Sequence, residues 1–197
     1  MRKILLFLFL LISVTEKSLS DDISTFEIEG MSIGDSLLDH FTKKKITTSI
    51  VNWYDRLEKK RYTAIALGSE KFKQYDFVDI FTNYGDESYK IETIAGVIYF
   101  GKDKEIKDIN HCYKKQITIA NEIKSIFKGI KQKGPIKTTF KKADPTGKSS
   151  YTDIYFDLKN NYHVGISCYD WSDDIKKKED HLYLFIRSNK VNDWLNN

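Results

Sequence analysis

Proline and glycine are scarce in this chain of 197 residues, which contains 2 Pro and 10 Gly. So low a content excludes collagen-like repeats and Pro- or Gly-rich low-complexity segments. The remaining composition, 41% hydrophobic and 30% charged, is that of an ordinary globular protein. Because no Pro-, Gly- or Ser-rich linker divides the chain, we expect one folded domain.

Long apolar runs are also lacking beyond the first residues. The one clear run, Ile4 to Ile12, is shorter than the about 20 residues that cross a bilayer. It follows a basic start, Arg2-Lys3, and precedes the small residues Ser18 and Ser20. This pattern is typical of a secretory signal peptide rather than of a membrane anchor.

We therefore expect a signal peptide over residues 1–20 and a single domain over residues 21–197. Cleavage after Ser20 would leave a mature protein without a membrane span, located in the periplasm or secreted. The region around the cleavage position holds no cysteine, which excludes a lipoprotein-type anchor.

A strong charge of one sign is absent as well. The formal net charge is +4, and removing residues 1–20 takes away three basic residues and one acidic residue, which leaves +2. Acidic residues and lysines alternate along most of the chain, whereas a nucleic-acid-binding protein concentrates basic residues on one face. Only 4 of the 32 basic residues are arginine, the residue best suited to bidentate phosphate recognition. We expect no nucleic-acid partner.

Cysteine is limited to two residues, Cys112 and Cys168. Apolar residues recur at three- and four-residue steps from Ile106 to Ile130, which predicts one long amphipathic helix with Cys112 on its apolar side. Alternation in the strand Tyr162 to Tyr169 places Cys168 on the apolar face with Val164. Both cysteines then lie between helix and sheet. Export favours a disulfide between them, and two buried free thiols are the alternative.

The two cysteines could also combine with His111 and His163 as zinc ligands. His163 and Cys168 are five residues apart on one strand and therefore point to opposite faces. His111 and Cys112 diverge by about 100° around the helix. We therefore expect no metal at these residues.

The order of the elements predicts an α+β fold. Two short helices, from Gly34 to Phe41 and from Lys43 to Ser49, precede three strands. The long helix, which Lys133-Gly134-Pro135 ends, precedes three more strands and a short terminal helix near residues 190–195. We expect an antiparallel sheet with the long helix packed on one face. The six expected strands are Tyr62–Leu67, Tyr75–Thr82, Tyr89–Phe100, Tyr151–Leu158, Tyr162–Tyr169 and His181–Ser188.

This order is similar to a duplicated unit of helix and meander, as in the outer-membrane assembly lipoproteins and the β-lactamase-inhibitor proteins. The similarity rests on element order alone, because no residue-level repeat occurs at a fixed period. It implies no ligand or partner for this chain.

The hairpin formed by the strands at 151–158 and 162–169 carries the candidate site. A three-residue turn pairs apolar Phe156 with Val164, whereas a two-residue turn would pair an inward residue with outward His163. The three-residue turn is therefore predicted, and it places Asp157 opposite His163 on the solvent side. The candidate ligand-binding residues on this Tyr-rich face and just beyond it are Tyr155, Asp157, His163, Tyr169 and Trp171.

Two catalytic patterns fail when their spacing is checked. Gly147-Lys148-Ser149 looks like the end of a phosphate-binding loop, but that loop needs a glycine at the position of Lys142 and a helix after it. Asp157 and His163 are half of a nucleophilic site. However, Ser167 lies four residues along the strand, roughly 13 Å from His163, which is too far for direct proton transfer.

Five motifs distributed over nearly the whole mature chain mark a resemblance to other proteins. They are Phe26-Glu-Ile-Glu-Gly-Met-Ser-Ile-Gly-Asp-Ser36, the strand Tyr89–Phe100 before the Cys112 helix, Gly147-Lys-Ser before Thr152-Asp153, Cys168-Tyr-Asp-Trp171 and Asp180-His-Leu182. In these motifs the chain resembles a family of uncharacterised exported proteins from AT-rich marine bacteria. The resemblance implies export and a single domain. The family has no known activity, so the resemblance implies no ligand and no catalytic residue.

From these observations we expect an exported binding or interaction module, whose partner is an unidentified envelope component or a small ligand. The alternative is a small envelope hydrolase that uses His163 with Asp157, or His181 near Asp180. An enzyme is the less favoured interpretation, because no complete catalytic constellation can be located. We expect no cofactor, and the sequence leaves the ligand and the oligomeric state open.

Overall fold

The computed structural model of the chain has an α+β fold, as the order of elements predicts. Eight strands form one sheet in the described part of the chain, all neighbouring strands are antiparallel, and three α-helices accompany them. No helix among the described residues is both long and apolar enough to cross a membrane. The expected signal peptide, residues 1–20, lies outside the described residues. The structure describes Ile23 and residues 26–52, 61–101, 106–141, 143–158, 161–175 and 178–196.

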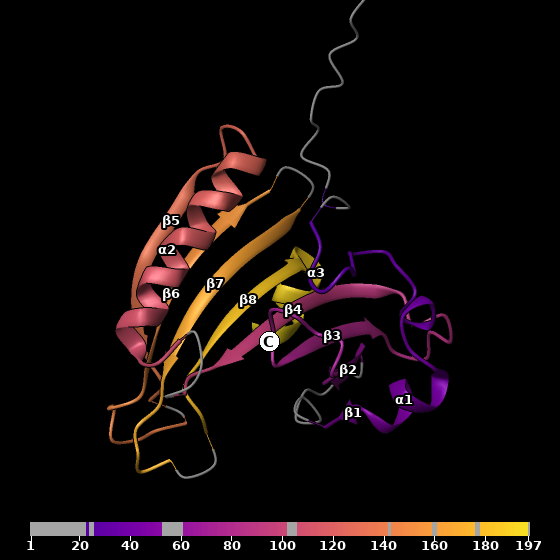
Figure 1. Cartoon of the computed structure of the whole chain (residues 1–197), viewed down its shortest axis with the longest axis horizontal. Coiled ribbons are helices and arrows are strands. Elements are labelled where there is room, and N and C mark those ends of the chain that lie inside the picture. The colour runs from indigo at the N-terminus through magenta and orange to yellow at the C-terminus, as the bar shows by residue number, and fades with distance from the viewer. Residues whose placement is uncertain are drawn as a thin grey trace, which may run out of the picture.

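The sheet is built from two four-stranded meanders (Figure 1). Strands β1 to β4 follow helix α1, strands β5 to β8 follow helix α2, and the pairing of β4 with β8 joins the two sets. The resulting order is β1-β2-β3-β4-β8-β7-β6-β5. The strand bounds are β1 Ile50–Val51, β2 Tyr62–Leu67, β3 Phe77–Asn83, β4 Ile91–Tyr99, β5 Gln132–Thr139, β6 Ser150–Asp157, β7 Tyr162–Asp170 and β8 His181–Ser188.

Three of the four helical elements, η2, α1 and α2, are shorter than the sequence predicts, whereas α3 is slightly longer. Ser36 and Thr42 each cap a helical element, because each side chain accepts a hydrogen bond from a backbone N–H of the turn that follows. The two caps are only six residues apart. The segment between them therefore forms one 3-10 turn instead of the expected helix through Phe41. Helix α2 starts after its cap, Asp108, and ends before Gly129, whose φ of +79° turns the chain toward β5. The bounds are η2 Leu37–Asp39, α1 Lys43–Thr48, α2 Ile109–Ile126 and α3 Asn189–Asn196.

Strands β1 and β5 were not among the six predicted strands. Strand β1 has only two residues, and β5 is the longer omission. The sequence indicates only a helix end at Lys133-Gly134-Pro135, but Gln132–Thr139 pairs with β6 at the edge of the sheet. The register shifts between Lys133 and Ile136, so Pro135 falls in a bulge. An edge strand accepts proline there, because a bulge residue need not donate to the ladder.

Helix α2 is tied to the sheet by a covalent bond and by a buried amide. The Cys112–Cys168 disulfide joins it to β7, with the two Cα atoms 6.0 Å apart, so the predicted disulfide is confirmed. One turn further along α2, Gln116 Nε2 donates to the backbone carbonyls of Thr152 in β6 and Ile166 in β7, both at 2.7 Å. Gln116 is 1% exposed, and these two bonds satisfy both donors of its buried amide.

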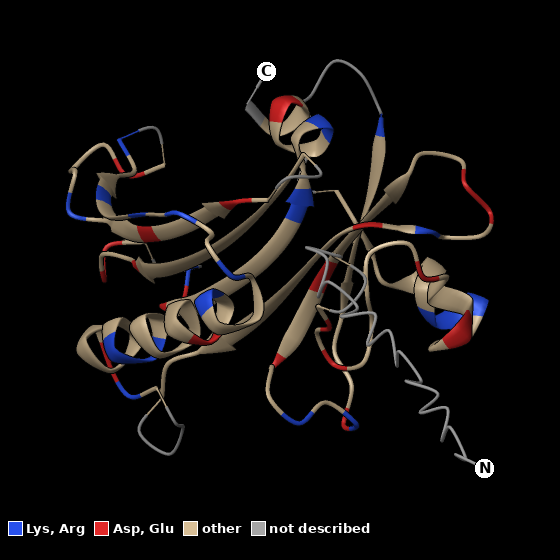
Figure 2. Cartoon of the chain, turned by 90° about the horizontal axis from the view of Figure 1, so that it is seen from above, with Lys and Arg blue, Asp and Glu red and all other residues tan. Residues whose placement is uncertain are grey.

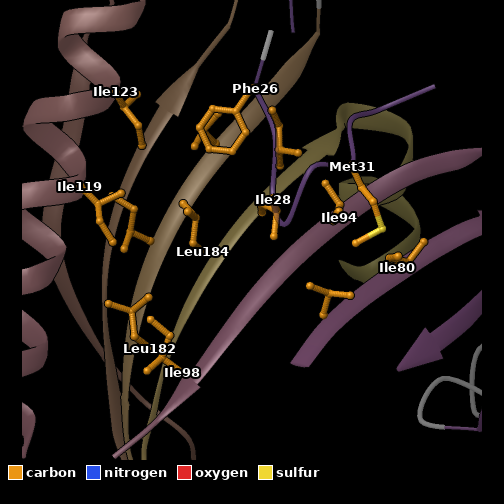
Figure 3. Close-up of a cluster of buried hydrophobic side chains, with 14 of the residues drawn as sticks. Phe26, Ile28, Met31, Ile80, Ile94, Ile98, Ile119, Ile123, Leu182 and Leu184 are labelled. Carbon is orange, nitrogen blue, oxygen red and sulfur yellow. The ribbon is translucent and has the colours of Figure 1, made fainter. Parts of the chain in front are cut away.

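The main apolar core combines α2, the sheet and the N-terminal segment (Figure 3). Ile119 and Ile123 of α2 belong to the same buried cluster as Leu184 of β8. The N-terminal segment adds Phe26 and, next to the strands of the first meander, Met31. The core therefore extends under both meanders.

Glu29 anchors the N-terminal segment. Its carboxylate accepts hydrogen bonds from the backbone N–H groups of Lys73, Gln74 and Tyr75, at 2.7 to 3.1 Å. Because a carboxylate accepting several backbone N–H groups forms strong, charge-assisted bonds, this contact fixes the segment beside the loop before β3.

The predicted register of the β6–β7 hairpin is confirmed. Asp157 pairs with His163, and Phe156 pairs with Val164. The backbone N–H of Leu158 donates to the carbonyl of Tyr162 at 2.8 Å, which closes a three-residue turn. Phe156 and Val164 are fully buried, as the alternation requires.

Helix α3 lies on the face of the sheet opposite α2 (Figure 2). Val191 and Trp194 pack with Tyr62, Ala64 and Phe81 in a second, smaller cluster. The Trp194 ring meets the rings of Tyr62 and Phe81 edge-on, with centroids 5.2 and 5.9 Å apart. One corner of this face is therefore covered by the chain itself.

We predict that replacing both Cys112 and Cys168 by alanine lowers the free energy of unfolding by about 4 kcal/mol, because the bridge closes a loop with a sequence separation of 56. Urea unfolding of the double variant and of the wild type, each with and without reductant, measures the difference. Reductant should change only the wild type. Two reactive thiols in denatured, unreduced wild type would contradict the disulfide.

Candidate functional site

The face of the sheet opposite α2 carries the candidate site, and we call it the aromatic face. Strand pairing arranges its residues in rows, so Tyr151, Tyr169, His181 and Tyr99 follow one another across β6, β7, β8 and β4. Neighbouring strands lie about 4.8 Å apart, close enough for side chains in one row to touch. The face consists of Phe77, Asp79 and Phe81 in β3; Thr93, Ala95, Val97 and Tyr99 in β4; His181, Tyr183, Phe185 and Arg187 in β8; His163, Gly165, Ser167 and Tyr169 in β7; and Tyr151, Asp153, Tyr155 and Asp157 in β6.

Stacked rings cover one end of this face. Tyr169 stacks on His181 with centroids 4.4 Å apart and planes 10° apart, and on Tyr151 at 5.7 Å. Phe140, from the loop after β5, stacks on Tyr169 at 5.5 Å and on Trp171 at 4.6 Å. All five rings are half-buried, so the stack retains exposed edges.

The ring contacts continue across the boundary between the two meanders. His181 of β8 meets Tyr99 of β4 at 5.9 Å, and Tyr99 meets Phe77 of β3 at 5.6 Å. Tyr183 meets Tyr169 edge-on at 6.2 Å and Phe185 at 5.8 Å. One continuous layer of rings thus spans five strands.

Arg187 is positioned by a ring and a glycine. Its guanidinium lies 3.7 Å from the centroid of the Phe185 ring, a cation–π contact. The ring itself lies against Gly165, where an added Cβ would be 2.2 Å from Phe185 Cζ. A side chain at position 165 would therefore displace both the ring and the guanidinium.

Four polar atoms of the aromatic face are buried and have no hydrogen-bond partner. They are Asp79 Oδ1, Thr93 Oγ1, Asp153 Oδ1 and Arg187 Nε. Buried polar atoms are normally paired, and each unpaired one costs about 1–3 kcal/mol. The aromatic face thus concentrates groups that a ligand could satisfy.

Burial shifts the pKa values of two acids and one imidazole on this face. It raises the pKa of Asp79 to about 7, although the Tyr183 hydroxyl donates a hydrogen bond that acts in the opposite direction. Burial also raises the pKa of Asp153, against the opposing effects of Ser167 and Arg187. It lowers the pKa of His181, whose neutral form is favoured.

Three of the five predicted site residues lie together at one end. His163 Nδ1 is 2.6 Å from Asp157 Oδ1, and Lys133 of β5 also pairs with Asp157. The hydrogen bond from Lys133, more than the one with His163, lowers the pKa of Asp157. Tyr155 lies beside them, with Lys133 Nζ 5.3 Å from its ring centroid.

The other two, Tyr169 and Trp171, lie at the opposite end. Six residues separate His163 from Tyr169, which is roughly 20 Å at the rise of a strand. Trp171 Nε1 is buried without a partner, and Lys178 Nζ lies 5.5 Å from the Trp171 ring centroid. The predicted residues therefore form two groups on one surface rather than one compact site.

Asp79, Arg187 and Phe140 were not among the predicted site residues. Phe140 lies outside the strands, so no alternation pattern indicates its contacts. Asp79 does carry a signal, because it is an acid between the apolar residues Val78 and Ile80 of a strand. Its burial on the aromatic face depends on side chains from β8 and β4, which the local pattern does not reveal.

Among the described residues, the structure does not bring a serine together with either of the two candidate Asp-His pairs. Ser167 is buried and hydrogen-bonded to Asp153, so its hydroxyl is already engaged. In the second candidate pair, His181 Nδ1 lies 2.7 Å from a backbone carbonyl, and Asp180 accepts a backbone N–H at 2.6 Å. Asp157 and His163 are in contact, but Ser167 stands four residues away on the same strand.

The remaining motifs have structural explanations. Asp144 accepts hydrogen bonds of 2.6 to 2.9 Å from the backbone N–H and hydroxyl groups of Thr146 and Ser149, which hold its pKa well below the usual range. This closed loop leads into β6, as predicted. Cys112 and Cys168 are bonded to each other and cannot serve as zinc ligands. The described residues contain no group of three His, Cys, Asp or Glu that could hold a metal ion.

Comparison of the chain with models of protein families, with curated proteins and with solved structures gives no match. The resemblance to exported proteins of marine bacteria therefore stays a prediction. The chemistry of the aromatic face has to be inferred from its own residues.

We predict that Gly165→Ala lowers the free energy of unfolding by about 1–3 kcal/mol, because the new methyl group overlaps the Phe185 ring. Gly68→Ala is the matched control, since a Cβ there meets nothing closer than 3.9 Å. Urea unfolding of both variants measures the effect. Equal stability of the two variants would show that Phe185 does not lie against Gly165.

We predict that Asp79→Asn is more stable than the wild type at pH 8 and loses this advantage at pH 4. The pKa of Asp79 is about 7 in the folded state, above the ordinary 3.8. Between pH 3.8 and pH 7 the folded state therefore keeps a proton on Asp79 that the unfolded state has released. The free energy of unfolding of the wild type therefore falls as pH rises through this window, on the order of a few kcal/mol. Thermal unfolding across pH 4 to 8 measures it, and a pH-independent difference would contradict the burial of this charge.

Proposed function

We propose that the protein is an exported binding module and that the aromatic face is its binding surface. One observation carries the proposal, namely that a single sheet face combines a continuous layer of half-buried rings with four buried, unpaired polar atoms. A ligand that covers the rings and pairs with these atoms would recover the free energy lost by leaving them unpaired.

The position of the long helix supports this choice of face. Helix α2 is bonded to β7 and shares the main apolar core, so we place it over the other face of the sheet. Helix α3 covers only the corner around Tyr62 and Phe81. The rest of the aromatic face, from Phe77 and Asp79 of β3 across β4, β8, β7 and β6, is then the part that a partner can reach.

Export is part of the proposal. Residues 1–20 would act as the signal peptide, and the mature domain would work in the periplasm or outside the cell. The Cys112–Cys168 disulfide supports this location, because such bonds persist in oxidising compartments. The partner would be an envelope component or a small ligand of that compartment.

A small envelope hydrolase is the alternative, and the contact of 2.6 Å between Asp157 and His163 is the observation in its favour. The surroundings of the pair favour a structural role. Lys133 shares the Asp157 carboxylate, and the side chain of Ser167 is bonded to Asp153. An exposed pair of this kind contributes at most about 1 kcal/mol to stability.

Site-specific photo-cross-linking tests the binding surface. We predict that p-benzoylphenylalanine at position 155, on the aromatic face, gives a discrete adduct when the full chain is irradiated in its native host. The matched control is position 84, because Tyr84 is 61% exposed but lies in the turn after β3. The control should give no adduct of the same mass.

Two results would contradict the proposed function. Equal labelling at positions 155 and 84, or no adduct at either, would show that the aromatic face has no preferred partner. Hydrolysis of p-nitrophenyl acetate that His163→Ala abolishes would instead support the hydrolase.

A further inference from the structure

Asp79 is a carboxylate set among apolar side chains. Its register partners are Ala66 in β2 and Ala95 in β4. On the same side of β3 its neighbours are Phe77 and Phe81. None of these four side chains can donate a hydrogen bond or carry a charge. The position is therefore costly for a carboxylate unless a donor reaches it from elsewhere.

The chain supplies one such donor and leaves one acceptor unpaired. Tyr183 hydrogen-bonds to the carboxylate, whereas Asp79 Oδ1 is buried without a partner. Arg187, the cation of the same face, is stacked on Phe185 and acts on the pKa of Asp153 instead. Among the described residues no cation compensates Asp79.

Aromatic rings lie on both sides of Asp79 along its strand. Phe77 contacts Tyr99 at 5.6 Å on one side, and Phe81 contacts Trp194 of α3 at 5.9 Å on the other. Rings attract cations through their faces, and an open carboxylate oxygen accepts a charge-assisted hydrogen bond. Together these features are suited to an organic cation.

We propose that Asp79 is a subsite of the aromatic face for an alkylammonium group, of the kind that a lysine side chain or a free alkylamine carries. The ammonium group donates a hydrogen bond to the Asp79 carboxylate, and its alkyl chain packs on the neighbouring rings. This inference rests on the proposed binding function and names the chemistry of one part of its ligand.

A hard metal ion is a poorer match for the same position than an ammonium group. Hard cations such as Ca²⁺ and Mg²⁺ need six or more oxygen ligands in a defined geometry. In the part of the chain that the structure describes, no three acidic, His or Cys residues come together to provide them. An alkylammonium needs a single carboxylate in apolar surroundings.

Titration of pentylammonium chloride into ¹⁵N-labelled protein at pH 8 tests the subsite, with the amide signals of Asp79 and Ala95 as the readout. We expect saturable shifts for the wild type and at least tenfold weaker binding for Asp79→Asn, which keeps the acceptor for Tyr183. Asp39→Asn is the control. It removes an exposed carboxylate of η2, outside the aromatic face, and binding should be unchanged.

The pH dependence gives a second readout that needs no variant. Burial raises the pKa of Asp79 to about 7. The titratable groups that act with Asp79 are Tyr183 of β8 and Tyr99 of β4. From β2 and α3 the neighbouring side chains are Ala66 and Trp194, which carry no charge. Burial raises the pKa of Tyr99 as well, and the affinity of the wild type should be about tenfold higher at pH 8 than at pH 6.

Two further probes separate the sources of the ammonium group. N-acetyl-lysine methylamide represents a peptide-borne cation, and saturable binding of it or of pentylammonium supports the subsite. Pentan-1-ol is the neutral control and should not bind. Equal binding of pentan-1-ol, equal affinity of Asp79→Asn, or no saturable binding of either amine would overturn the inference. If the adduct at position 155 persists in that case, only the cation subsite fails; if the adduct is also absent, the binding face fails with it.

Discussion

The pairing of β4 with β8 is the interaction on which the rest of the structure depends. Seven residue pairs, from Thr93↔Arg187 to Tyr99↔His181, join two meanders that would otherwise form separate sheets. Through this boundary the core becomes continuous on one face. On the other face, the ring contacts pass from β8 to β4, and Tyr183 of the second meander reaches Asp79 of the first. Neither half carries the candidate site by itself.

The two faces of the sheet meet different physical demands. The core face is held by apolar burial, by the disulfide and by the buried amide of Gln116, whose donors are both paired. The aromatic face keeps two acids at positions where burial raises their pKa values, Asp79 and Asp153. A buried charge lowers the free energy of unfolding at neutral pH, so the carboxylate of Asp79 opposes stability, and the proposed cation would offset this cost on binding.

Local pattern was sufficient for most of the elements but not for β5 or for the two-residue strand β1. Strands with alternating apolar residues were predicted close to their observed bounds, and β2 and β8 match them. Strand β5 is almost wholly exposed at the edge of the sheet and contains Gly134 and Pro135. Without a buried side it has no alternation to detect, and its strand conformation depends on pairing with β6. The helix ends were misjudged for a related reason, because capping by Thr42 and Asp108 overrode the apolar periodicity.

By itself the sequence determined which side chains share a face within a hairpin. Alternation is a local property of a strand, and core burial allows only one register, so Asp157 faces His163 and Cys168 faces the layer that holds Cys112. Only the tertiary structure decided which strands became neighbours across the middle of the sheet. The β4–β8 contact joins segments far apart in the chain, and no local pattern specifies that choice. For that reason the edge-on contact of His181 with Tyr99 and the hydrogen bond between Tyr183 and Asp79 emerged only with the folded sheet.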